Sequence, residues 1–154
     1  MFRLAEYVPY LLNRAGARIA GSFSAELAAH GISLQAWRVL AALLDATALR
    51  MGDLGRLTSI EVSTLTRIVD GMEAQGLVER RRGPDDARSV WVEPSARGRA
   101  LGRRIVPEAL RYESIALEGF SADEAAQLRS LLVRVFANMD RLGGVRARPR
   151  RKAG

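Results

Sequence analysis

The chain of 154 residues contains no cysteine and only one histidine, His30. Without cysteine there can be no disulfide, no thiolate nucleophile and no cysteine metal site, and a lone histidine leaves a histidine-based zinc site without partners. A glycine loop of the form Gly-x-x-x-x-Gly-Lys, which would cradle a phosphate, is also missing. We therefore expect no catalytic residues, no metal and no cofactor, and conclude that the chain is not an enzyme.

Long hydrophobic runs are missing too. Charged residues interrupt the start of the chain at Arg3, Glu6, Arg14 and Arg18. No apolar run approaches the roughly 18 residues that a membrane span requires, and no signal-peptide core is visible. These absences predict a cytoplasmic protein without a membrane partner.

Positive charge is in excess and is clustered. The chain has 24 Lys and Arg against 17 Asp and Glu, which gives a net charge of +7. One cluster is the tail, residues 143–154, which has five basic residues and no acid. The other consists of arginines between residues 76 and 104: Arg80, Arg81, Arg82, Arg88, Arg97, Arg99, Arg103 and Arg104. A polyanion is the natural partner of such a surface, although charge alone leaves a merely solvated face as the alternative.

Apolar residues at spacings of three and four predict a series of amphipathic helices. The first has a stripe formed by Val8, Leu12, Ala15, Ile19, Phe23 and Leu27. This stripe is longer than a small domain can cover, and a partner chain is one way to cover it. Further helices are predicted at 34–46, 51–57 and 61–75, the last of these preceded by a capping box formed by Thr58 and Glu61.

The predicted helix at 61–75 has two different faces. The apolar face, which should point to the core, is formed by Val62, Leu65, Ile68, Val69 and Met72. The opposite side carries Ser63, Thr64, Thr66 and Arg67. Short hydroxyl side chains with one arginine allow close approach of another backbone, whereas a solvated face is more typically filled with Glu and Lys. Asp70 shares this side and could instead pair with Arg67 across one turn.

The pattern then changes to short strands. Residues 77–82 and 89–93 are predicted strands, and the turn-forming residues between them predict a hairpin. Ser95 is the expected N-cap of a helix that reaches about residue 118 and is kinked at Pro107. A capping box of Ser121 and Glu124 should start the last helix. Its apolar stripe is Leu128, Leu131, Leu132, Val135, Phe136, Met139 and Leu142. The tail is expected to be disordered.

This order of elements is that of a winged helix-turn-helix, in which the helix before the hairpin enters the major groove of DNA. Its hydroxyls at Ser63, Thr64 and Thr66, together with Arg67, could then contact phosphates or bases. Of the three arginines that alternate along the first strand, only Arg80 and Arg82 share a face that can meet the duplex. At the hairpin tip, Arg88 is placed to enter a minor groove and Asp86 to orient its guanidinium.

Several segments resemble one protein family. The run Leu65-Thr66-Arg67-Ile68-Val69-Asp70, the run Gly76-Leu77-Val78-Glu79-Arg80, and the run Asp86-Ala87-Arg88-Ser89-Val90-Trp91-Val92 are similar to the fourth helix and the wing of the MarR family of bacterial transcription regulators. Ser95 and Gly98 match the Thr-x-x-Gly of that family's next helix. The resemblance covers nearly the whole chain except the tail. Pro94 departs from the usual leucine, which leaves the end of the second wing strand open.

The resemblance implies a mainly α fold with a small β-hairpin wing. Residues 1–31 would form an N-terminal dimerisation helix, 32–94 the winged helix-turn-helix, 95–142 the C-terminal dimerisation helices and 143–154 the basic tail. It also implies a homodimer that binds a palindromic operator in double-stranded DNA, with half-sites about 10 base pairs apart. Such a protein is commonly a repressor that a small aromatic acid, or a related conjugate, releases from DNA.

An effector site is predicted where the first helix approaches Trp37. Tyr10, Arg14 and Arg18 lie at helical spacing, and an arginine beside aromatic rings can bind a carboxylate while the rings hold an aromatic body. Alternatively, Trp37 is ordinary core and Arg14 pairs with an acid in the dimer interface. A winged-helix DNA-architectural or protein-interaction module without an effector also remains open, because a fold does not settle function.

Overall fold

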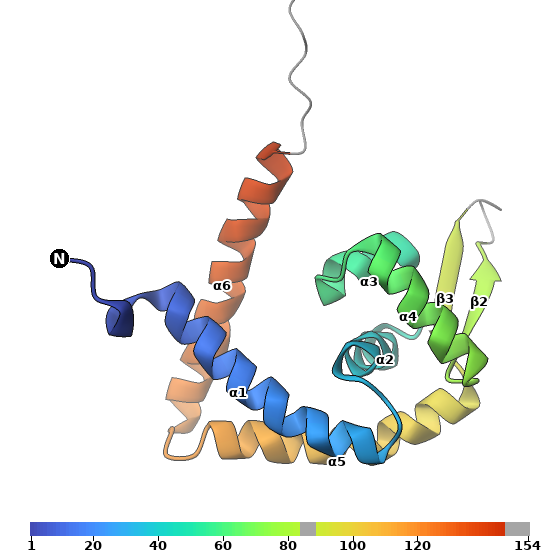
Figure 1. The fold of residues 1–154 in the computed structure, drawn as a ribbon, viewed down its shortest axis with the longest axis horizontal. Coiled ribbons are helices and arrows are strands. Elements are labelled where there is room, and N and C mark those ends of the chain that lie inside the picture. Colours follow the sequence, from blue (N-terminus) through green and yellow to red (C-terminus); the bar gives the residue numbers. More distant parts are fainter. Residues whose placement is uncertain (84–88, 147–154) are drawn as a thin grey trace, which may run out of the picture. The chain divides into compact units, whose positions relative to one another are not determined.

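The computed structural model describes residues 1–83 and 89–146, with side chains as far as residue 142. After a short 3-10 turn at Leu4–Glu6, the elements are α1 (Val8–Ala29), α2 (Leu34–Ala46), β1 (Leu49–Arg50), α3 (Met51–Thr58), α4 (Val62–Ala74), β2 (Val78–Arg82), β3 (Val90–Pro94), α5 (Ala96–Ala116) and α6 (Ala122–Arg146) (Figure 1). The predicted class, mainly helical with a small β wing, is confirmed. The chain divides into two compact units, Met1–Glu113 and Ser114–Gly154.

Helix α2 is the centre of the first unit and contacts α1, α3, α4 and β3 (Figure 1). It begins at the N-cap Ser33, whose hydroxyl accepts a hydrogen bond from the amide of Ala36. The core around α2 consists of aliphatic side chains that are fully buried: Leu27, Val39, Leu40, Leu43, Leu54, Leu65 and Val69. Burial of this many large aliphatic groups makes hydrophobic packing the main source of stability in this unit.

The strands form one antiparallel sheet in the order β1-β3-β2. Strand β1, which the sequence did not predict, has only two residues and is too short to show an alternating pattern. Pro94 is the last residue of β3, where it pairs with Val78 and is fully buried. Because the strand ends there, the N–H that proline lacks interrupts no ladder of hydrogen bonds beyond it. Ser95 then caps α5 by accepting from the amide of Gly98 at 2.9 Å, as predicted.

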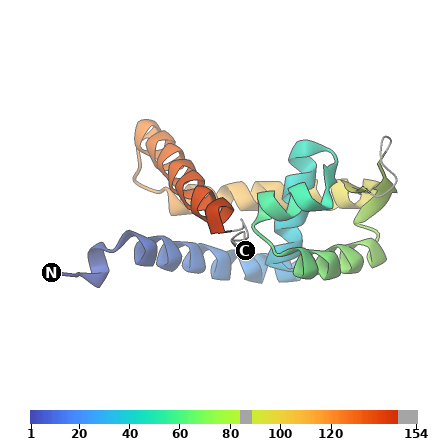
Figure 2. The ribbon, with the colours of Figure 1, turned by 90° about the horizontal axis from the view of Figure 1, so that it is seen from above.

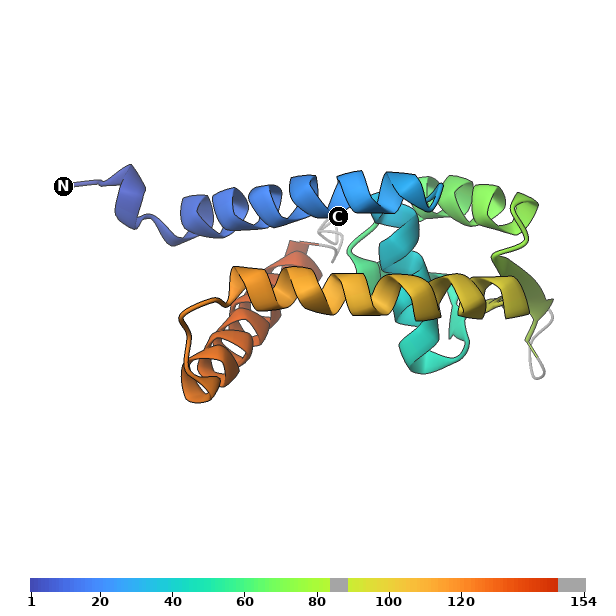
Figure 3. The same cartoon turned by 90° about the horizontal axis from the view of Figure 1, so that it is seen from below.

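Helix α5 packs closely on the start of the wing and then runs alongside α1 (Figures 2 and 3). Gly98 is required for the first contact, because a Cβ there would lie 2.0 Å from the carbonyl oxygen of Leu77. Near the other end of α5, Tyr112 packs against Phe23 of α1 with ring centroids 5.3 Å apart, and Arg111 forms an ion pair with Glu26 at 3.0 Å. Pro107 lies inside α5, which continues to Ala116.

The two predicted capping boxes differ in outcome. Ser121 and Glu124 form theirs, since the Ser121 amide donates to Glu124 at 2.8 Å and the Glu124 amide donates to the Ser121 hydroxyl at 3.2 Å. The box of Thr58 and Glu61 is wrong. Thr58 is the last residue of α3, and its hydroxyl donates to the carbonyl of Leu54. Glu61 caps α4 itself, because its carboxylate accepts from the amide of Thr64.

Helix α6 carries its apolar stripe but buries none of it. Most of its apolar side chains are exposed, namely Leu131, Leu132, Val133, Val135, Phe136, Met139 and Leu142, and no side chain of α6 up to residue 142 is buried. Helix α1 behaves in the same way from its start to Ile19. Its stripe is buried at Phe23 and Leu27 but exposed at Val8, Leu12 and Ile19.

Some sequence predictions fall outside the described residues: the wing tip with Asp86 and Arg88, and the tail beyond Arg146. Helix α6 itself continues through Gly143 and Gly144, where the sequence predicted its end. Within the described part of the chain, no single helix has the length and hydropathy of a membrane span; only α1 and α2 taken together meet that criterion, and they are bent by 85° at their junction. Among the same residues, no group of three acidic or histidine side chains could hold a metal ion.

Candidate nucleic-acid interface and ligand pocket

Helix α4 presents a polar face because its other face is fixed in the core. Leu65, Val69 and Met72 are buried, and this turns all four predicted contact residues outward, Ser63, Thr64, Thr66 and Arg67, each of which is exposed. Val62, which was predicted to face the core, is instead 56% exposed. The position next to it on α3 is Gly55, which has no side chain to cover it.

The polar side chains of α4 differ in how free they are. The hydroxyl of Thr66 donates to the carbonyl of Val62 at 2.8 Å, and that of Ser63 donates to the carboxylate of Glu61. For Thr64 and Arg67 the described residues provide no side-chain hydrogen bond or ion pair. The side-chain donors that remain available to another molecule on this face are therefore the Thr64 hydroxyl and the Arg67 guanidinium.

Glu61 fills the N-terminus of α4 with its own negative charge. Hydrogen bonds from the hydroxyl and backbone of Ser63, and from the backbone of Thr64, hold the pKa of the Glu61 carboxyl below its usual value. A carboxylate is favoured at this end of a helix because the first amides carry partial positive charge. Since Glu61 already uses these amides, a phosphate is better served by the exposed donors one turn further along α4.

Arg80 of β2 is bound to α4. Its guanidinium donates to Glu73 at 2.7 Å, to Asp70 at 2.6 Å and, less closely, to the carbonyl of Thr66 at 3.4 Å. The alternative in which Asp70 pairs with Arg67 is thus not the arrangement found, because the Asp70 carboxylate is held by Arg80. The predicted contact between Arg80 and DNA stays a prediction, but its donors are already engaged.

The other wing arginines lie on opposite faces of the sheet. Arg80 and Arg82 pair with Val92 and Val90 of β3, whereas Arg81 pairs with Trp91. Because paired residues share a face and successive residues alternate, Arg82 lies on the same side as Arg80. It is exposed, and the described residues provide no partner for it. Arg81 lies on the other side and forms an ion pair with Glu93.

The sequence did not predict a second basic surface, which lies on the other side of the sheet. Arg50 of β1 lies over the ring of Trp91 at 5.2 Å from its centroid, and Arg81 is the cross-strand neighbour of Trp91 on the other side. The indole N–H of Trp91 is buried and has no hydrogen-bond partner among the described residues. The sequence does not show this surface because the surface depends on β1, and a strand of two residues is too short to leave an alternating pattern. This row of arginine, indole and arginine extends the positive surface of the wing.

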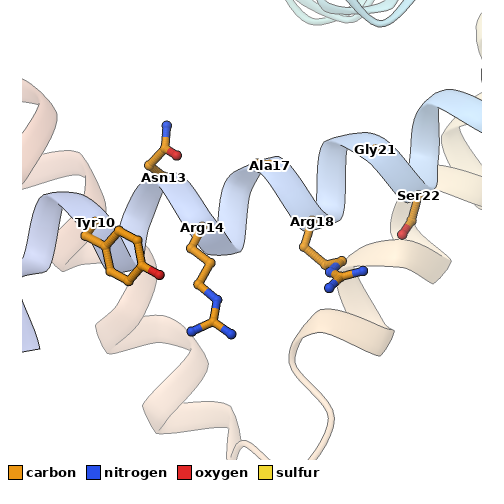
Figure 4. A pocket seen from close by; sticks show the side chains of 7 residues that line it. All are labelled: Tyr10, Asn13, Arg14, Ala17, Arg18, Gly21 and Ser22. Atoms are coloured by element: carbon orange, nitrogen blue, oxygen red, sulfur yellow. The ribbon is translucent and has the colours of Figure 1, made fainter. Parts of the chain in front are cut away.

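A pocket of about 630 Å³ lies along α1 and contains most of the predicted effector residues. It is lined by Tyr10, Asn13, Arg14, Ala17, Arg18, Gly21 and Ser22. Figure 4 shows the side chains of Tyr10, Arg14 and Arg18 extending from the same side of α1, and both arginines are exposed. Trp37 is not part of this group. It is 8% exposed and packs edge-on against Phe23 in the core.

Comparison with known proteins gives a consistent result. Residues 30–89, from the end of α1 to the start of β3, match the model of the MarR family. A curated relative, the homoprotocatechuate degradative operon repressor of Escherichia coli, is 31% identical over 111 residues, which are 70% of this chain and 73% of that protein.

Two solved structures are similar over most of their length. A transcriptional regulator of the MarR family from Silicibacter pomeroyi is 33% identical, with a TM-score of 0.80 over 88% of this chain and 92% of that one. The BpsR protein of Bordetella bronchiseptica is 27% identical, with a TM-score of 0.74 over 83% of this chain and 97% of that one. DNA binding by BpsR is regulated by 6-hydroxynicotinic acid.

Proposed function

Because the chain belongs to the MarR family, whose members are DNA-binding transcription regulators and not enzymes, we propose that it is a homodimeric repressor of a palindromic operator. In this proposal a small aromatic carboxylate, or a conjugate of one, releases it from double-stranded DNA. The observation that carries the proposal is the exposed face of α4. On this face Arg67 and Thr64 have no side-chain partner among the described residues, while Leu65 and Val69 anchor the helix in the core.

Contact with DNA is assigned as follows. Helix α4 enters the major groove, where Arg67 can bind a guanine edge or a phosphate and Thr64 can donate to either. Ser63 and Thr66 line the same face and can still accept hydrogen bonds through their oxygens. Arg82 reaches the backbone from the wing. Arg88 and Asp86, at the wing tip, complete the contact in the adjacent minor groove.

Dimerisation is proposed for residues 1–31 and 95–142, which flank the winged helix of 32–94. The support is the row of exposed apolar side chains on α1 and the separate row on α6, since large exposed apolar patches mark interaction sites on soluble proteins. A second copy of the same chain is the occupant that also explains a palindromic site, because two-fold symmetry then places two α4 helices about 10 base pairs apart. The tail, residues 143–154, would add non-specific attraction to DNA.

The effector is proposed to bind beside Arg14 and Arg18. Their guanidinium groups can hold a carboxylate with charge-assisted hydrogen bonds, and Tyr10 can pack against an aromatic body. Two relatives point to the same chemistry, since one represses a homoprotocatechuate degradative operon and the other is regulated by 6-hydroxynicotinic acid. Trp37 is left in the core because of its burial.

Selection of DNA from a random duplex pool, followed by footprinting, tests the proposed activity. We expect enrichment of a short palindrome and protection of two half-sites about one helical turn apart. Protection without sequence preference would support an architectural protein instead. An absence of duplex binding in dilute salt would remove the proposal.

The effector site is tested by titrating the complex of the chain and the selected duplex with 6-hydroxynicotinic acid and with benzoate. Release by either acid is expected to need about 10- to 100-fold more ligand in Arg14→Gln, since a hydrogen bond to a charged group contributes about 1.5–3 kcal/mol. Arg38→Gln is the matched control, because Arg38 is exposed on α2 and does not line the pocket. If both variants are released at the same ligand concentration as the wild type, Arg14 does not take part in ligand binding.

A further inference from the structure

One wing arginine, Arg80, is held by hydrogen bonds and ion pairs to side chains of its own chain. Arg80 is the middle residue of β2, and its side chain is 24% exposed, less than the Asp70 and Glu73 side chains that it joins. Its backbone amide also donates to Glu73, at 3.3 Å. Strand and helix are therefore joined through both the main chain and the side chain of one residue.

The groups that hold Arg80 follow one side of α4. Thr66, Asp70 and Glu73 are four and three residues apart, so they lie one above the other along α4. The guanidinium spans all three, with one nitrogen on Glu73 and the other on Asp70 and the carbonyl of Thr66. A planar fork held at several points fixes orientation better than a single ion pair does.

We infer that Arg80 is a positioning residue, which sets the angle between the wing and α4 and keeps Asp70 away from Arg67. This inference rests on the proposed function, since it concerns the helix that reads DNA. Asp70 lies one turn from Arg67, where opposite charges on a helix attract each other. With its carboxylate held by Arg80, Asp70 does not compete with DNA for the Arg67 guanidinium.

Arg82 provides the internal comparison. It lies two residues from Arg80 on the same strand and the same face, yet it is exposed and has no partner among the described residues. An arginine that neutralises a phosphate releases a counterion, so its loss lowers the slope of log affinity against log salt by about one. The two arginines should therefore differ in the salt dependence of binding.

The experiment measures the affinity of the full chain for two duplexes, the one selected by the wild type and a scrambled one, over a series of salt concentrations. The variants are Arg80→Met, Arg80→Lys, Asp70→Asn, the double variant Arg80→Met with Asp70→Asn, and Arg82→Ala. Circular dichroism identifies any variant that does not fold. If Arg80→Met is one of these, Arg80→Lys decides the question, because lysine keeps the charge but lacks the fork.

Arg82→Ala is expected to lower the salt slope by about one for both duplexes. Arg80→Met should weaken binding to the selected duplex about tenfold with an unchanged slope, and adding Asp70→Asn should restore at least about threefold, as coupled neighbours do. Arg80→Lys should also lose preference for the selected duplex.

Three results would overturn the inference: a fall of about one in the slope for Arg80→Met, no restoration by Asp70→Asn, or wild-type preference in Arg80→Lys. The first would place Arg80 on a phosphate. The second would show that Arg80 does not act by holding Asp70, and the third that its guanidinium fork is not needed. A wild-type chain that selects no duplex would instead remove the proposed function itself.

Discussion

The winged helix and helix α6 use the same kinds of apolar residue in opposite ways. In the winged helix, Leu40, Leu43 and Leu65 are completely buried. In α6, Leu132 is 40% exposed and Phe136 is 56% exposed. Both sets follow the helical spacing that defines an amphipathic helix. The stripe in the winged helix is covered by its own chain, whereas the stripe on α6 is not.

This difference separates two tasks within one short chain. A region with a complete core can present side chains such as Arg67 and Arg82 in fixed positions without help from another molecule. A 25-residue helix with an uncovered apolar face gains its stability from whatever covers that face. In the proposed dimer the first region reads DNA, and the second sets the distance between two readers.

The largest expected effect is in the core of the winged helix. Leu40→Ala should lower the free energy of unfolding by about 2–5 kcal/mol, because it removes buried methyl groups and leaves a cavity. Leu57→Ala is the control, since Leu57 is a leucine of the same unit that is 59% exposed. Urea unfolding followed by circular dichroism measures both. Equal losses would mean that this core is not the source of stability.

A change in α6 should act on assembly and leave the winged helix folded. Phe136→Ala is expected to weaken the dimer by about 2–4 kcal/mol, as the loss of a central aromatic group does in other interfaces. Ser130→Ala, at an exposed polar position of the same helix, should leave the dissociation constant unchanged. Sedimentation equilibrium measures this constant. A Phe136→Ala chain that associates as strongly as the wild type would show that α6 is not in the interface.

A change on the exposed polar face of α4 should alter DNA binding and leave dimerisation unchanged. Arg67→Ala is expected to relax the sequence preference at one base pair of each half-site by about 1–3 kcal/mol, because a bidentate contact to a base is lost. The variant should still form a dimer. Competition binding with singly substituted duplexes measures the preference. Full discrimination by the variant would remove Arg67 from base readout and leave it, at most, on a phosphate.

The smallest effect concerns pH and compares one helix cap in each region. Hydrogen bonds from Ser121 hold the pKa of the Glu124 carboxyl below its usual value, as those from Ser63 do for Glu61. A carboxyl whose pKa is lowered by folding stabilises the folded state above the unfolded pKa, and this contribution is lost as pH falls through the folded pKa.

The stability measured by thermal unfolding should therefore decrease when the pH is lowered past about 4.5, which is near the pKa of an unperturbed glutamate. Glu61→Gln and Glu124→Gln should each make this fall shallower, because the glutamine side chain does not titrate. A fall with unchanged steepness in both variants would attribute the pH dependence to other carboxyls.

Much of the fold could be predicted from the sequence because its signals are local. Spacing of apolar residues indicated the helices, and turn residues indicated the hairpin. Ser95 and the pair Ser121 and Glu124 marked helix starts correctly, since capping depends on residues only three apart. The exposed polar face of α4 followed in the same way from the apolar face opposite to it.

The errors and omissions come from features that the spacing within one predicted helix does not show. Thr58 had the right spacing for a cap, but α3 extends through it and takes its hydroxyl. Val62 matched the apolar stripe but is exposed, because its neighbour on α3 is Gly55, which has no side chain to cover it. The partner of Asp70 is Arg80, ten residues away on a strand, and not the nearer Arg67. Spacing on one helix cannot distinguish these cases, because they are decided by where the neighbouring helix ends and by packing between elements.

The central claim is that two copies of this chain bind one duplex. Sedimentation of the full chain with the selected palindromic duplex in excess tests it most directly, since each chain contributes 16.9 kDa. We predict a complex with two chains per duplex and, without DNA, a species of twice the chain mass. A complex with a single chain on the palindrome, or a free protein that stays monomeric at the same concentration, would contradict the account.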